Sequence, residues 1–117
     1  MPVEGFHTIV LQVSNLARSI DFYEAALGRD FARQSDRAAQ VRLGASALLL
    51  HVEYEPLPTP RGAGVHVNFS VANAREHHAA LESRGLSPGA VSARPWGSQF
   101  TLTDPDGYVI EFLGPAG

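Results

Sequence analysis

The sequence predicts an α+β fold made of two modules, each with the order strand, helix and three further strands. Segments with strand and helix character follow one another in this order twice. A landmark, Val13-Ser-Asn15, returns 58 residues later as Val71-Ala-Asn73. Between the two copies, "EPLPTPRGAG" at 55–64 holds three prolines and two glycines and is incompatible with a helix or a central strand. We therefore expect one domain over 1–117, with modules 6–54 and 65–113 and a linker at 55–64 that leaves the two curved sheets to enclose a cleft.

In the first module, "FHTIVLQV" at 6–13 is rich in β-branched and apolar residues and predicts a strand. A helix follows, with Asn15 as its N-cap and Gly28 as its end. Shorter strand segments are expected at 31–35, 38–43 and 46–54. The predicted buried stripe of the helix consists of Leu16, Ile20, Tyr23 and Leu27.

The second module repeats this order. "VHVNFSV" at 65–71 predicts a strand, and Asn73 with Glu76 three residues later has the pattern of a capping box. The helix is expected to close at Gly85. Strand segments at 90–94, 98–103 and 108–113 follow, and "DPDG" before the last of them is a turn.

Composition narrows the class of protein. The chain has 117 residues, 44% of them hydrophobic and 18% charged, as expected for one soluble globular domain. A net charge of −3 offers no basic stripe for nucleic acid, and no apolar run approaches the length of a membrane span. The start has no signal-peptide pattern and there is no cysteine, which agrees with a cytoplasmic protein. A chain of this size gains stability by pairing, so a homodimer is expected.

One carboxylate stands out in the last predicted strand. Because successive side chains of a strand point to opposite faces, Glu111 lies opposite the large apolar residues Tyr108, Ile110 and Phe112. The same alternation places a polar set on the corresponding faces of other strands: His51, Glu53, His66, Asn68, Ser70, Gln99, Thr101 and Thr103. An ordinary solvated sheet surface is one interpretation. The mixture of His, Asn, Gln and Thr with Val and Leu favours a small-molecule pocket instead.

His51, His66 and Glu111 offer two imidazoles and one carboxylate. This nitrogen and oxygen set holds divalent Fe, Mn, Ni, Co or Zn and leaves coordination positions open. A single histidine at such a place would more often be structural. Three of these residues on converging faces indicate a metal site, provided that the fold brings them together.

Two stretches, "SNLARSIDFYEAALG" at 14–28 and "WGSQFTLTDPDGYVIEFL" at 96–113, resemble the vicinal oxygen chelate superfamily. It includes glyoxalase I, fosfomycin- and bleomycin-resistance proteins and extradiol dioxygenases. The resemblance implies paired βαβββ modules whose first and last strands supply metal ligands. It implies Glu111 and His66 as ligands and His51 as a third candidate. In the first strand the superfamily's histidine position holds Thr8, and His7 is one residue away, so His7 reaches the cleft only through a bulge.

The resemblance implies two functions for the cleft. In the first, a divalent metal chelates vicinal oxygens of a small substrate in a lyase, isomerase or transferase reaction, and Glu53 or Glu111 moves a proton. In the second, the protein binds no metal and sequesters a drug or metabolite. Hairpin packing is the alternative role for Arg94, Trp96 and Gln99. The residues expected to line the cleft are Thr8, Asn68, Arg94, Trp96, Gln99 and Thr101.

Overall fold

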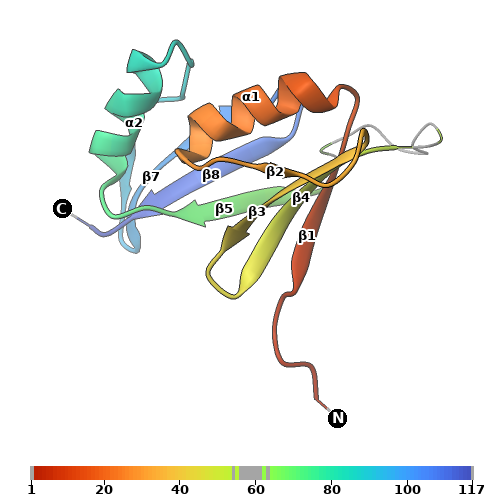
Figure 1. The fold of residues 1–117 in the computed structure, drawn as a ribbon. Coiled ribbons are helices and arrows are strands. Elements are labelled where there is room, and N and C mark those ends of the chain that lie inside the picture. The colour runs from red at the N-terminus through yellow and green to blue at the C-terminus, as the bar shows by residue number, and fades with distance from the viewer. Residues whose placement is uncertain (1, 54, 56–61, 63, 117) are drawn as a thin grey trace. The chain divides into compact units, whose positions relative to one another are not determined.

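The computed structural model describes residues 2–53, 55, 62 and 64–116, which form two compact units, Met1–Pro58 and Thr59–Gly117. Most of the predicted linker at 55–64 lies outside the described residues. The elements of the first unit are β1 (Thr8–Val13), α1 (Leu16–Leu27), β2 (Ala32–Arg33), β3 (Ala38–Leu43) and β4 (Ser46–Val52). Those of the second are β5 (His66–Ser70), α2 (Ala74–Ser83), β6 (Ser92–Arg94), β7 (Gly97–Thr103) and β8 (Val109–Gly114) (Figure 1).

Each unit contains one four-stranded mixed sheet. The strand order is β1-β4-β3-β2 in the first unit and β5-β8-β7-β6 in the second. The first and last strands of each unit pair in parallel, and the other pairs are antiparallel. The predicted α+β fold with two βαβββ modules is therefore confirmed. The last strand of each unit is an inner strand of its sheet, with a neighbour on both sides.

Helix α1 begins and ends where the sequence predicts. The Asn15 side chain accepts a hydrogen bond from the Arg18 N–H at 3.0 Å, and Gly28 closes the helix in the left-handed conformation at φ 67°. The predicted stripe was partly wrong, because Ile20 and Leu27 are only half-buried. The residues that α1 buries are Leu16, Ser19, Tyr23 and Ala26. Small side chains at two of these positions let the helix lie close to β3 and β4.

Helix α2 packs on its sheet through an aromatic cluster. Asn73 caps it by accepting from the Glu76 N–H at 3.0 Å. Beneath the helix, Phe100 and Phe112 stack with ring centroids 5.1 Å apart. The His77 ring lies 4.6 Å from that of Phe112, so this histidine belongs to the packing under the helix.

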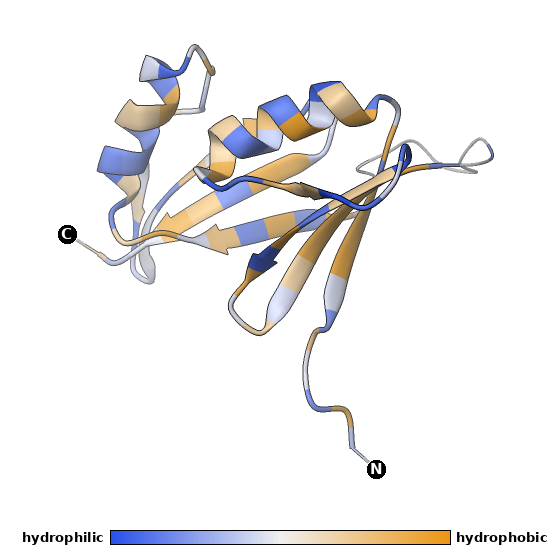
Figure 2. Cartoon of the chain, viewed as in Figure 1, coloured by the Kyte–Doolittle hydropathy of each residue, from blue (hydrophilic) through white to orange (hydrophobic). Residues whose placement is uncertain are grey.

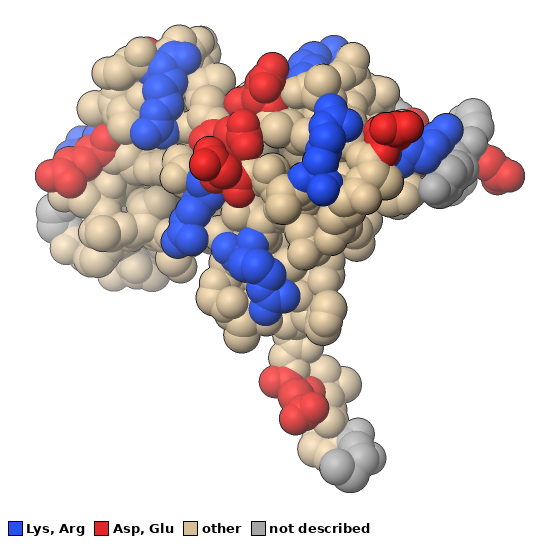
Figure 3. Space-filling model, viewed as in Figure 1, with Lys and Arg blue, Asp and Glu red and all other residues tan. Residues whose placement is uncertain are grey.

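Charged side chains are spread over the surface. On the face shown in Figure 3, acidic and basic groups lie among one another, in agreement with the small net charge of −3. None of the described helices has the length and apolar character needed to span a membrane.

The turn between β7 and β8 depends on Asp104, which is 5% exposed. Its Oδ1 accepts hydrogen bonds from the N–H groups of Asp106 at 2.8 Å and Tyr108 at 2.9 Å. Gly107 completes the turn at φ 92°. This carboxylate therefore sets where β8 begins, and with it the position of Glu111.

We expect Asp104→Ala to lower the free energy of unfolding by about 2–4 kcal/mol, because two N–H groups lose a charged acceptor. Urea unfolding followed by circular dichroism measures the change. Asp30→Ala, at an exposed loop position, is the matched control and should change stability by less than about 0.5 kcal/mol. Equal stability of the two variants would contradict this role of Asp104.

Ser19 is fully buried in α1, and its hydroxyl has no hydrogen-bond partner among the described residues. A buried hydroxyl without a partner is destabilising, and alanine is the better helix former. Ser19→Ala should therefore raise the free energy of unfolding by about 1 kcal/mol. Ser83→Ala, at the exposed end of α2, changes helix propensity alone and should give a smaller gain. A loss of stability in Ser19→Ala would refute this expectation.

Candidate functional site

The sheet of the second unit has one apolar face and one mixed face, visible as alternating bands along β5 and β8 in Figure 2. Ile110 and Phe112 are buried on the α2 side, at 0% and 1% exposure. On the opposite, open face, the pairing register sets Glu111 between Asn68 of β5 and Thr101 of β7. The register agrees with the prediction that Glu111 lies on the face opposite to Ile110 and Phe112.

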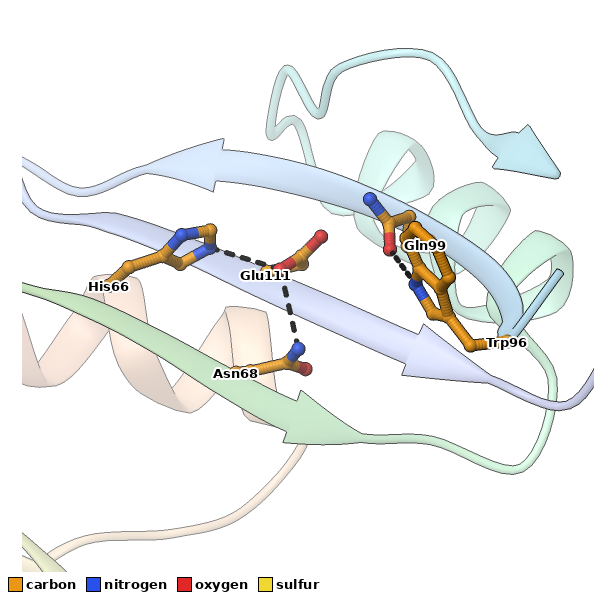
Figure 4. Close-up of polar contacts among 5 residues, drawn as sticks. All are labelled: His66, Asn68, Trp96, Gln99 and Glu111. Atoms are coloured by element: carbon orange, nitrogen blue, oxygen red, sulfur yellow. Dashed lines mark hydrogen bonds and ion pairs between the residues drawn. The ribbon is translucent and has the colours of Figure 1, made fainter. Parts of the chain in front are cut away.

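Glu111 is only 8% exposed although it lies on the open face. Its Oε2 is 3.1 Å from Nε2 of His66 and accepts a hydrogen bond from Nδ2 of Asn68 at 3.3 Å (Figure 4). Among the described residues, Oε1 has no hydrogen-bond partner. A buried carboxylate requires partners of this kind, and one oxygen of Glu111 is left to accept from a bound molecule.

Trp96 lies in the turn before β7, and Gln99 lies in β7 itself. Nε1 of Trp96 donates to Oε1 of Gln99 at 2.9 Å, and the indole is 64% exposed (Figure 4). Arg94, the last residue of β6, is exposed. Thr101 is exposed beside Glu111. An aromatic ring with its polar edge fixed presents a flat apolar surface to a ligand.

The remaining candidates belong to the first unit. His51 is half-buried in β4 and is paired with Gln12 of β1. The β1–β4 register is uninterrupted from Thr8 to Val13, so by alternation Thr8 shares the face of His51. His7 precedes the strand, and its Nδ1 lies 2.6 Å from the Thr8 hydroxyl. Glu53 follows β4, and its backbone carbonyl accepts from Arg37 at 3.2 Å.

The second unit thus brings His66, Asn68 and Glu111 together, while His7, His51 and Glu53 belong to the first. Taken by itself, neither unit gathers three or more His, Asp or Glu side chains among its described residues. The sequence placed Asn68 on this face but missed that it would hold Glu111. The parallel register of β5 and β8 creates that contact, and local periodicity does not encode it.

Comparison with known proteins assigns the chain to a family. The model of the Glyoxalase/Bleomycin resistance protein/Dioxygenase superfamily matches residues 5–112. The chain belongs to this superfamily. Among its curated relatives, metallothiol transferase FosB of Staphylococcus haemolyticus is 32% identical to this chain over 72 residues. These residues are 61% of this chain, which spans about half (52%) of the length of that relative.

Solved structures agree with the superfamily fold. TnmS3, described as an antibiotic binding protein from Streptomyces sp. CB03234, is 26% identical over 99% of both chains, with a TM-score of 0.84. A lactoylglutathione lyase from Agrobacterium tumefaciens is 18% identical with a TM-score of 0.75, covering 97% of this chain and 96% of its own. At that identity the second comparison shows the fold alone.

Trp96 is the single tryptophan of the chain, so its fluorescence reports on this part of the site. Gln99→Ala removes the acceptor of the indole N–H, and we expect the steady-state fluorescence anisotropy of Trp96 to fall because the ring gains freedom. Gln40→Ala, in β3 of the first unit, is the control and should leave the anisotropy unchanged. An unchanged value in Gln99→Ala would show that the hydrogen bond does not hold the indole.

Proposed function

We propose that the chain is an enzyme that binds a small molecule at the open face of its second sheet, with His66 and Glu111 as two ligands of a divalent metal. The distance of 3.1 Å between Nε2 of His66 and Oε2 of Glu111 carries this proposal. Nitrogen and oxygen ligands at about 2.0–2.2 Å from one ion stand roughly 3.0–3.4 Å apart. An imidazole with a carboxylate suits Fe, Mn, Ni, Co or Zn.

The surroundings of Glu111 support a ligand role. Asn68 donates to its carboxylate, as an outer partner does when it orients a metal ligand. Val109 and Leu113 lie on the same face of β8, one on each side of it. Burial of this carboxylate to 8% exposure is costly, and a cation would offset that cost more fully than an imidazole that is half exposed.

The further ligand set and the reaction belong to the same proposal. His51 is the next candidate ligand and His7 a further one, both from the first unit. A bound divalent metal would supply stabilisation of negative charge on two oxygens of the substrate. Glu53 would move a proton, while Thr101 and Asn68 would hydrogen-bond the substrate. Similarity to a metallothiol transferase supports a transferase, and a lyase or isomerase reaction is what the resemblance to the superfamily implies besides.

Calorimetric titration with Mn, Fe(II), Ni, Co and Zn tests the metal site. We expect stoichiometric binding to the wild type and a loss of affinity of more than about 100-fold in Glu111→Gln, since even outer partners contribute 10–100-fold. Asn68→Ala should lose about tenfold. Glu4→Gln, which removes an exposed carboxylate, is the charge-matched control. The metal proposal fails if none of the five ions binds the wild type stoichiometrically.

A metal-free binding protein is the second candidate, favoured by two observations. Thr8 takes the position where the resemblance implies a histidine, which leaves one imidazole fewer. The Trp96 indole is 64% exposed and fixed by Gln99, as a stacking surface for a planar ligand would be. The similarity to TnmS3, described as an antibiotic binding protein, supports this candidate.

Chelation separates the two candidates. For the binding protein, quenching of Trp96 fluorescence by a panel of planar aromatic drugs should be unchanged by EDTA and by Glu111→Gln. Trp96→Ala should then abolish binding in calorimetry. For the enzyme, EDTA removes ligand binding. We further propose a cytoplasmic homodimer, for which light scattering should give twice the chain mass of 12.6 kDa.

A further inference from the structure

A cavity lies in the same unit as Glu111, at the N-terminus of α2. Its volume is about 250 Å³, well above the roughly 10–15 Å³ that one water molecule needs. The cavity is lined by Ala72, Asn73, Ala74, Arg75, Ser98, Pro115 and Ala116. Ser98 alternates with Gln99 along β7 and shares the α2 side of the sheet with Phe100. The cavity is therefore separate from the open face that carries Glu111.

The first turn of α2 supplies backbone donors to this cavity. Asn73 satisfies the N–H of Glu76 with its side chain. Among the described residues, no acceptor faces the N–H groups of Ala74 and Arg75. Free N–H groups and the positive end of the helix dipole favour an anion at this place.

A buried hydroxyl from another element points to the same kind of ligand. Ser98 is 4% exposed, lines the cavity, and has no side-chain hydrogen-bond partner among the described residues. The hydroxyl is not among the fully buried side-chain atoms without a partner, so it is accessible from the cavity. An oxygen of a bound anion can accept its hydrogen bond.

The charged group that lines the cavity is positive, as the binding of an anion requires. Arg75 contributes a guanidinium that forms no ion pair with any other described residue, and no carboxylate side chain is among the lining residues. The donors come from a helix backbone, a strand hydroxyl and an arginine side chain. A tetrahedral phosphate, with oxygens pointing in several directions, suits such a set better than a planar carboxylate.

We propose that this cavity binds a phosphate group, either as free inorganic phosphate or as the phosphate of a small phosphate ester. The phosphate oxygens accept from the N–H groups of Ala74 and Arg75 and from the Ser98 hydroxyl, while the Arg75 guanidinium neutralises the charge. Binding here needs no metal and no occupant at the open face.

The test is a titration of the full ¹⁵N-labelled chain with inorganic phosphate at constant ionic strength, followed by amide chemical shifts. We expect saturable shifts at Ala74, Arg75 and Ser98. Arg75→Gln should weaken binding by at least about tenfold, since it removes a charged hydrogen-bond donor. Ser98→Ala should weaken it by about three- to tenfold. Arg33→Gln makes the same charge change at an exposed position of β2 and should bind as the wild type does.

Further ligands and variants make the result decisive. Glycerol phosphate should compete with inorganic phosphate if an ester is the ligand, whereas acetate at equal concentration should not. Glu111→Gln should retain phosphate binding, which separates this proposal from that of the metal. The proposal is overturned if the shifts do not saturate, if they lie elsewhere, or if Arg75→Gln and Arg33→Gln weaken binding equally.

Discussion

Burial of one carboxylate on a sheet face is the constraint that organises the second unit. Glu111 belongs to β8, which is flanked by β5 and β7, so its side chain lies between two neighbouring rows of residues. Burying a carboxylate costs several kcal/mol unless it is paired. Both partners come from β5, where His66 and Asn68 are two residues apart and therefore on one face. The site is thus built by strand register and not by loops.

Local patterns in the sequence predicted the order of the elements and the faces of the strands, but only part of the buried face of α1. Asn15 and Asn73 are cap residues whose side chains do accept the predicted N–H groups. The two-residue period placed Glu111 and His66 on the open face. The contact between them depends on the parallel pairing of β5 with β8, two strands separated by a helix and two further strands. Only the resemblance to a known fold could anticipate that pairing.

The sequence patterns did not predict the burial of two serine side chains. Ser19 and Ser98 are at most 4% exposed, although serine carries no apolar signal that would predict burial. Ser19 is buried because α1 lies close to its sheet, and Ser98 because β7 begins beneath the first turn of α2. In both cases packing geometry places a hydroxyl where composition would predict an apolar side chain. Ser98 also lines a cavity together with other hydrogen-bond donors.

The register of β1 limits which side chains the first unit can present on the face of His51. A slip by one residue would bring His7 to the face that Thr8 now occupies, but it would also turn Leu11 and Val13 outward. These side chains are 2% and 0% exposed, and losing their burial would cost about 3–6 kcal/mol, a large part of the stability of a small domain. The burial of Leu11 and Val13 therefore keeps Thr8, with its hydroxyl group, at this position of β1. In the proposed metal site, His51 would therefore be the principal imidazole of the first unit, and the loss of one nitrogen donor is an argument for the metal-free binding protein.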